Sequence, residues 1–131
     1  MRGNMRSFGE ILASLREERG IYQKELAAIL KVSVGTISNY ENNIHFPDQE
    51  ALLQLADYFG VTTDYLLGRT PYRYPLDTLQ EECAPGILVS DLVEIMRRFH
   101  EKNILSLLDY MELLELREKA ESPKEDPADD E

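Results

Sequence analysis

The stretch that decides the fold is residues 23–42, which read QKELAAILKVSVGTISNYEN. Its first part places Leu26, Ala27 and Leu30 on one face at helical spacing and predicts a short helix over residues 23–30. Ala27 is small, and a long side chain at this position would hold a second helix away. The pattern therefore predicts two short helices that cross in close contact.

The second part of this stretch supplies the turn and the second helix. Lys31 and Val32 form a tight turn, and Ser33 is a favourable N-cap for a helix over residues 34–42. Ile37 faces inward, where it fills the space between the two helices together with the leucines of the first. The opposite face of this helix stays free to point away from the core.

Three further short helices are predicted around this pair. Ser7 begins an S-x-x-E capping box ahead of a helix over residues 8–19. Asp48 and Thr62 are suitable N-caps for two more helices, each of which ends at a glycine. The five helices predict a small all-α domain over residues 7–68.

The C-terminal half has a different organisation. Residues 69–86 lose the helical periodicity and contain three prolines, which is typical of a linker. Helical spacing of apolar residues resumes over residues 87–119, with a polar break at residues 101–103, where Asn103 is a candidate N-cap. An antiparallel hairpin is favoured over one long helix. The acidic composition of residues 120–131 predicts a disordered tail.

Composition and charge exclude several classes of protein. With 43% hydrophobic residues among 131 the chain is not disordered throughout, and no apolar run approaches membrane-spanning length. The lone Cys83 fits a reducing cytoplasm. The net charge of −11 is unevenly distributed: residues 71–131 have seven Lys and Arg against sixteen Asp and Glu, whereas residues 1–47 have six against five. The charge neither requires nor excludes nucleic-acid binding.

Taken together, the apolar positions, caps and turns of residues 7–68 resemble those of the phage-repressor-like (Xre) helix-turn-helix family. The resemblance is carried by LREERGIYQKELAAILKVSVGTISNYENN, followed by FPDQEALLQLADYFGVTTDYLLG, and it covers about half of the chain. It implies a five-helix DNA-binding domain whose third helix enters the major groove of operator DNA. The expected function is that of a sequence-specific bacterial transcription regulator.

The resemblance also implies roles for single residues. The positions expected to contact bases are Ser33, Val34, Gly35, Ser38 and Asn39. The positions expected to contact phosphates are Gln23, Lys24, Lys31, Thr36, Asn42 and Asn43. Arg16 and Glu41 match a structural ion pair between helices. Asn39 is the strongest candidate for reading a base, because an amide can bond adenine bidentately.

Three residues depart from the family pattern. Tyr22 stands where the second helix has a small polar cap, and Lys31 and Asn43 stand where glycine is frequent. At Lys31 this predicts either a strained φ or a variant turn. Asn tolerates a positive φ better than Lys does.

The C-terminal helices are too small to be stable alone, so they need a partner. That partner is either a second copy or the N-terminal domain, and a homodimer is favoured because paired helices about 34 Å apart can read a two-fold operator. The residues expected to hold the dimer are Leu88, Leu92, Ile95, Phe99, Ile104, Leu107, Leu108, Met111 and Leu114.

The function expected from the sequence is that of a dimeric repressor that binds double-stranded operator DNA. The alternative is a protein-interaction module, antitoxin-like or regulatory, that acts through the acidic C-terminal helices. An enzyme is disfavoured because the sequence offers no nucleophile with a base and no Gly-rich phosphate loop. Neither a cofactor nor a metal is expected, since His100 and Cys83 lack partners at metal-ligand spacing.

Overall fold

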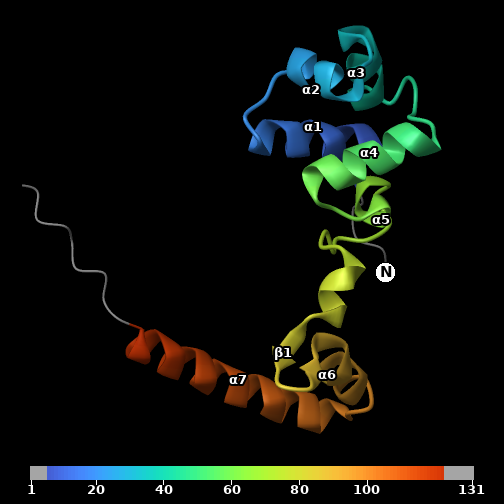
Figure 1. The fold of residues 1–131 in the computed structure, drawn as a ribbon. Coiled ribbons are helices and arrows are strands. Elements are labelled where there is room, and N and C mark those ends of the chain that lie inside the picture. Colours follow the sequence, from blue (N-terminus) through green and yellow to red (C-terminus); the bar gives the residue numbers. More distant parts are fainter. Residues whose placement is uncertain (1–5, 123–131) are drawn as a thin grey trace, which may run out of the picture. The chain divides into compact units, whose positions relative to one another are not determined.

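The computed structural model describes residues 6–122 and is mostly helical, with a small two-stranded hairpin (Figure 1). It divides into an N-terminal unit, Met1–Thr78, and a C-terminal unit, Leu79–Glu131. Among the described helices, none is both long and apolar enough to cross a membrane. The predicted helical fold class is confirmed.

The N-terminal unit contains the five predicted short helices. They are α1 (Phe8–Glu18), α2 (Gln23–Leu30), α3 (Val34–Glu41), α4 (Gln49–Phe59) and α5 (Thr63–Leu66). The side chains of Ser7, Ser33, Asp48 and Thr62 each accept a backbone N–H at the start of a helix, as the sequence predicts. The first and third helices end one residue earlier than predicted, because Arg19 and Asn42 are their C-caps.

One hydrophobic cluster holds this unit together. Leu12, Leu26, Ile37, Leu55 and Leu66 have no exposed surface, and these leucine and isoleucine side chains come from all five helices. Close approach of α1 to α3 depends on Gly9, since a Cβ atom there would lie 2.2 Å from the backbone oxygen of Glu41. The core therefore fixes α3 against α1 and α2.

The segment that follows α5 packs on the N-terminal unit. The backbone oxygen of Arg73 accepts the N–H of Thr62 at 3.1 Å, and its side chain pairs with Glu18 at 2.8 Å. The guanidinium also lies over the ring of Tyr65. Part of the predicted linker is thus ordered against the helices.

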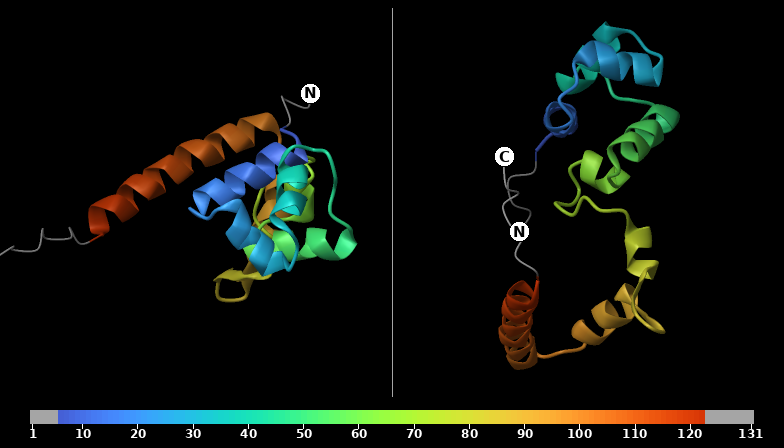
Figure 2. Two further views of the ribbon diagram at one scale, coloured as in Figure 1. Left: turned by 90° about the horizontal axis from the view of Figure 1, so that it is seen from above. Right: turned by 60° about the vertical axis from the view of Figure 1, so that its left-hand side comes forward.

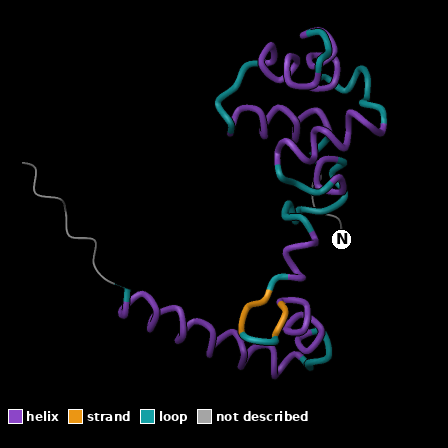
Figure 3. The backbone as a smooth tube through the Cα atoms, viewed as in Figure 1, coloured by secondary structure: helices purple, strands orange, loops and turns teal. Residues whose placement is uncertain are grey.

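The C-terminal unit has a hairpin and two helices. The strands β1 (Glu82–Ala84) and β2 (Ile87–Leu88) pair antiparallel after a 3-10 helix, η1 (Leu76–Gln80), and are drawn in orange in Figure 3. The helix α6 (Val89–Met96) follows, and then the uninterrupted helix α7 (Glu101–Glu121) (Figure 2). The sequence did not predict the hairpin, which lies within and just beyond the predicted linker.

The predicted break between the C-terminal helices was misplaced. Residues 97–100 separate α6 from α7, and His100 is the N-cap, so Glu101 and Asn103 lie inside the first turn of α7. The prediction of Asn103 as the cap was wrong: the N-cap is His100, whose backbone is extended and whose side chain makes no capping hydrogen bond. The helix continues to Glu121, and residues 123–131 of the predicted tail lie outside the described residues.

Candidate DNA-binding surface

The position of α3 is set by its cap and its buried face. The Ser33 Oγ accepts the N–H of Thr36 at 3.2 Å and lies 2.9 Å from the Thr36 hydroxyl. Ile37 and Tyr40 face the core, with 0% and 7% of their surface exposed. These contacts hold α3 from its first turn to its last, so the remaining face has a defined orientation.

The outward face of α3 is small and uncharged. Ser33, Val34 and Gly35 are exposed, whereas Ser38 and Asn39 are partly exposed further along the helix. A Cβ atom at Gly35 would meet open space, with the Ser33 Oγ at 3.8 Å as its nearest neighbour. The missing side chain at Gly35 is therefore not demanded by packing, in contrast to Gly9.

The end of this helix is closed by side-chain and backbone hydrogen bonds. The Asn42 Nδ2 donates to the backbone oxygen of Ser38 at 2.9 Å and lies 3.3 Å from its hydroxyl. The backbone oxygen of Asn39 accepts the N–H groups of Ile44 and His45. These contacts order the helix end and the following turn, while Asn42 remains exposed.

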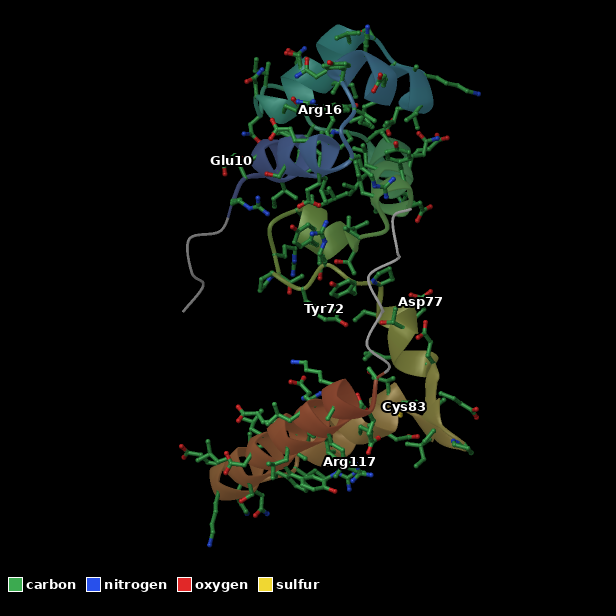
Figure 4. All side chains as sticks on the ribbon, turned by 90° about the vertical axis from the view of Figure 1, so that its left-hand side faces the viewer. Glu10, Arg16, Tyr72, Asp77, Cys83 and Arg117 are labelled. Carbon is green, nitrogen blue, oxygen red and sulfur yellow. The ribbon has the colours of Figure 1, made fainter. Side chains whose placement is uncertain are left out.

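Polar side chains join the first three helices beside this surface. Arg16 on α1 and Glu41 on α3 form an ion pair through two guanidinium nitrogens, and both side chains are largely buried. The Arg16 Nη1 donates to the backbone oxygen of Ile21 at 2.9 Å. The hydrogen bond to Glu41 raises the pKa of the Arg16 guanidinium. In Figure 4, Arg16 lies on the side of α1 that faces α2 and α3.

Gln23, the predicted phosphate contact at the start of α2, takes part in the same network. Its Nε2 donates to the Glu41 Oε2 at 2.6 Å. An amide nitrogen has two N–H groups, so the second donor stays available for a further acceptor. The sequence did not reveal this contact, because Gln23 and Glu41 lie 18 positions apart and only the fold brings them together.

An open hollow of about 440 Å³ lies at the start of α2. It is lined by Arg16, Tyr22, Gln23 and Lys24. The Lys24 Nζ lies 5.7 Å from the centre of the Tyr22 ring, and Tyr22 is 69% exposed. Two cationic side chains, an amide and a phenol therefore surround the helix start. Tyr22 belongs to this set, although the sequence marked it only as a departure from the family pattern.

Lys31 and Asn43, which replace common glycines, both adopt a positive φ. The values are 57° for Lys31 and 58° for Asn43. The Asn43 side chain is held by α1, since its Oδ1 accepts the N–H of Gly9 at 2.9 Å and its Nδ2 donates to the Ser7 Oγ at 3.1 Å. Lys31 and Lys24 are exposed cations.

The residues predicted to form a dimer lie in the C-terminal unit. Leu92, Ile95, Phe99, Leu108, Met111 and Leu114 are between 37% and 50% exposed. Leu88, Ile104 and Leu107 are partly exposed. None of residues 79–122 is buried, so the apolar side chains of this unit are only partly covered by their own unit.

The segment that contains the first five helices is similar in sequence to known helix-turn-helix proteins. The helix-turn-helix family model matches residues 12–66. The HTH-type transcriptional regulator ImmR of Bacillus subtilis is 41% identical over 63 residues, which are 48% of this chain and 50% of that protein. The chain thus matches about half the length of this relative.

The chain is also similar to a second regulator and to a phage repressor of known structure. A prophage-derived uncharacterised HTH-type transcriptional regulator of Bacillus subtilis, YonR, is 29% identical over 77% of this chain and 92% of its own length. A crystal structure of the P22 c2 repressor with a synthetic operator is 31% identical over 50% of this chain and 98% of its own, with a TM-score of 0.48.

Proposed function

The N-terminal unit belongs to the Xre-like helix-turn-helix family of transcription regulators, and from this premise we propose that the chain is a dimeric repressor of a two-fold operator. In this proposal α3 enters the major groove, which is wide enough for an α-helix. The C-terminal helices join two copies so that both copies of α3 reach successive turns of one face of the duplex.

The observation that carries this proposal is the exposed face of α3. Its fixed orientation presents Ser33, Val34 and Gly35 first, where the N-terminal residues of a recognition helix approach base edges. Small side chains allow close approach of the backbone, and Val34 can pack on a thymine methyl group. Asn39, together with Ser38, supplies polar groups that can bond a base edge.

Phosphate binding is assigned to the groups around this face. Gln23 and Lys24 line the open hollow at the start of α2, where a helix N-terminus also favours an anion. Thr36, Asn42 and Lys31 complete the proposed set. Asn43 can join it through the second N–H of its side-chain amide, because the first bonds the Ser7 Oγ and the backbone N–H already donates to Tyr40.

Few cations surround the proposed DNA-binding surface, and this supports a dimer. A single copy offers little counterion release, so its affinity for DNA should be low and weakly dependent on salt. Two linked copies multiply their affinities through a high effective concentration. The exposed stripe that includes Ile95, Leu108 and Met111 is the proposed contact between copies.

Selection from random duplexes with the purified full chain tests this proposal. We expect an enriched motif with two half-sites about one helical turn apart. Asn39→Ala should relax base preference at one position in each half-site, whereas Gln54→Ala, an exposed amide on α4, should leave the motif unchanged. Failure to enrich any motif would contradict sequence-specific binding. An equal loss of affinity for all sequences would place Asn39 at the phosphate backbone.

A further inference from the structure

The side chain of Gln23 at the start of α2 is bonded to the end of α3. Its Nε2 donates to the Glu41 Oε2 at 2.6 Å, and Glu41 is the last residue of α3. The Glu41 side chain is only 8% exposed, whereas Gln23 is partly exposed and lines the open hollow. A proposed phosphate contact is therefore tied to the helix that is proposed to enter the major groove.

The partner of this amide fixes the direction in which it is turned. An ionised carboxylate only accepts hydrogen bonds, so the amide has to present its nitrogen, and not its oxygen, to Glu41. The same nitrogen carries a second N–H, which can donate to a phosphate oxygen. An amide turned the other way would place a carbonyl oxygen, which repels a phosphate, in the position of this donor.

The carboxylate of Glu41 is itself held by Arg16. The Arg16 Nε pairs with one carboxylate oxygen, and its Nη2 donates to the other at 3.3 Å. The Arg16 Nη1 bonds the backbone oxygen of Ile21, two residues before α2, at 2.9 Å. The positive charge of Arg16 offsets the charge of Glu41, so the carboxylate can orient the amide without leaving an unpaired negative charge beside a phosphate.

We propose that Glu41 is a positioning residue for DNA binding, which turns and holds the Gln23 amide so that its second N–H meets a phosphate of the duplex. The inference rests on the proposed function and adds to it a role for Glu41 beyond the ion pair between helices. A side chain that is already ordered loses less rotamer freedom on binding. For one long side chain this loss corresponds to a roughly twofold to tenfold change in Kd.

The side-chain amide signals of Gln23 in NMR spectra of the full chain test the orientation. They are assigned by their absence from the spectrum of Gln23→Ala. Without DNA, we expect one Nε2 proton to be shifted downfield and to exchange slowly with water, unlike the protons of the exposed Gln54. A short duplex of mixed sequence should then shift the second proton, because phosphate contacts do not depend on sequence. Gln23 signals that match those of Gln54, or a second proton that the bound duplex leaves unshifted, would overturn the proposal.

A double-mutant cycle tests whether Glu41 acts on DNA binding through Gln23. Glu41→Met removes the acceptor, and it leaves the charge of Arg16 without a partner, which attracts any duplex. That attraction is the same with and without the Gln23 side chain, so it cancels in the cycle. We expect Gln23→Ala to weaken binding of the mixed-sequence duplex by a factor that is roughly twofold to tenfold smaller in Glu41→Met than in the wild-type chain. Equal factors in the two backgrounds would overturn the proposal.

A matched control separates positioning from a loosened helix. Ile37→Val removes a methyl group from the core at a residue of α3 that is 0% exposed, and it removes no hydrogen bond. Gln23→Ala should have its full effect on duplex binding in this background. A reduction as large as that in Glu41→Met would assign the coupling to the stability of α3 and overturn the proposal.

The outcomes for this inference and for the proposed function are distinct. A wild-type chain that binds no duplex would overturn both, whereas duplex binding without coupling between Gln23 and Glu41 would overturn the inference alone. Circular dichroism checks that each variant is folded. If Glu41→Met does not fold, the amide signals of the wild-type chain decide the question, since they require no substitution at Glu41.

Discussion

The two units of the chain differ in what covers their apolar side chains. Among residues 6–122, every buried hydrophobic residue lies in the N-terminal unit, from Phe8 to Leu66, whereas none of residues 79–122 is buried. The helices of the N-terminal unit bury their apolar faces in a common core, and capping side chains accept N–H groups at the starts of four of them. The C-terminal unit presents leucines to solvent along α7. The difference shows that the N-terminal unit has a core of its own, and it supports the proposal that the helices of the C-terminal unit are covered by a second copy.

The largest expected effect contrasts two leucines from these units. Leu12 has no exposed surface, so Leu12→Ala should lower the free energy of unfolding of the N-terminal unit by about 2–5 kcal/mol. Leu113 is 63% exposed, and Leu113→Ala should change the stability by less than about 0.5 kcal/mol. Chemical denaturation of both variants measures the contrast. A large loss for Leu113→Ala would show that the C-terminal unit buries this residue after all.

The second prediction compares two glycines within the N-terminal unit. Gly9→Ala forces a Cβ atom against the backbone of Glu41 and should destabilise the unit by about 1–3 kcal/mol or more. Gly35→Ala meets open space in a helix and should stabilise it by about 0.5–1 kcal/mol. The same variant should weaken operator binding. Thermal unfolding and a DNA titration together test both statements, and unaltered binding by Gly35→Ala would remove Gly35 from the DNA contact.

The third prediction concerns the strained turn between α2 and α3. Lys31 has a φ of 57°, so Lys31→Gly should relieve about 1 kcal/mol of backbone strain and raise the Tm. If Lys31 binds a phosphate, the variant should also lose affinity equally for all sequences and show a smaller salt dependence. A higher Tm with undiminished affinity would contradict the phosphate role. An unchanged Tm would contradict the strain.

The smallest expected effect tests where the N-terminal unit ends. The hydrogen bond from Arg73 lowers the pKa of the Glu18 carboxyl. The pair therefore stabilises the fold at pH values above the ordinary pKa of a glutamate. The contribution disappears as the pH falls through the lowered pKa. Glu18→Gln should therefore lower the Tm by at most ~1–2 °C near neutral pH and by less in acid, because exposed pairs contribute little. A difference that grows in acid would contradict the assigned direction.

Most of the N-terminal unit could be predicted from the sequence because its signals are local. The caps Ser33 and Asp48 mark helix starts within one turn, and apolar spacing identifies the buried faces. For Lys31, which stands where glycine is frequent, the sequence left a strained φ and a variant turn as alternatives, and its φ of 57° corresponds to the first. Such features depend on a few neighbouring residues, so the fold follows directly from them.

Other features depend on contacts that the sequence does not display. The hydrogen bonds of Gln23 to Glu41 and of Asn43 to α1 join residues far apart in the chain. The hairpin of β1 and β2 is too short for an alternating pattern to appear. The start of α7 was misplaced because Asn103 is a better cap by residue type than His100, which is the residue that caps the helix.

The separation of DNA reading from dimerisation is tested by comparing the full chain with a fragment of residues 1–78 on the operator obtained by selection. Mass in solution and DNA affinity are measured for both, and circular dichroism confirms that the fragment is folded. We expect a dimeric full chain and a folded monomeric fragment that binds at least about 100-fold more weakly, because the copies are no longer linked. A fragment that remains dimeric, or that binds the operator as tightly as the full chain, would contradict the assignment of DNA reading and dimerisation to separate units.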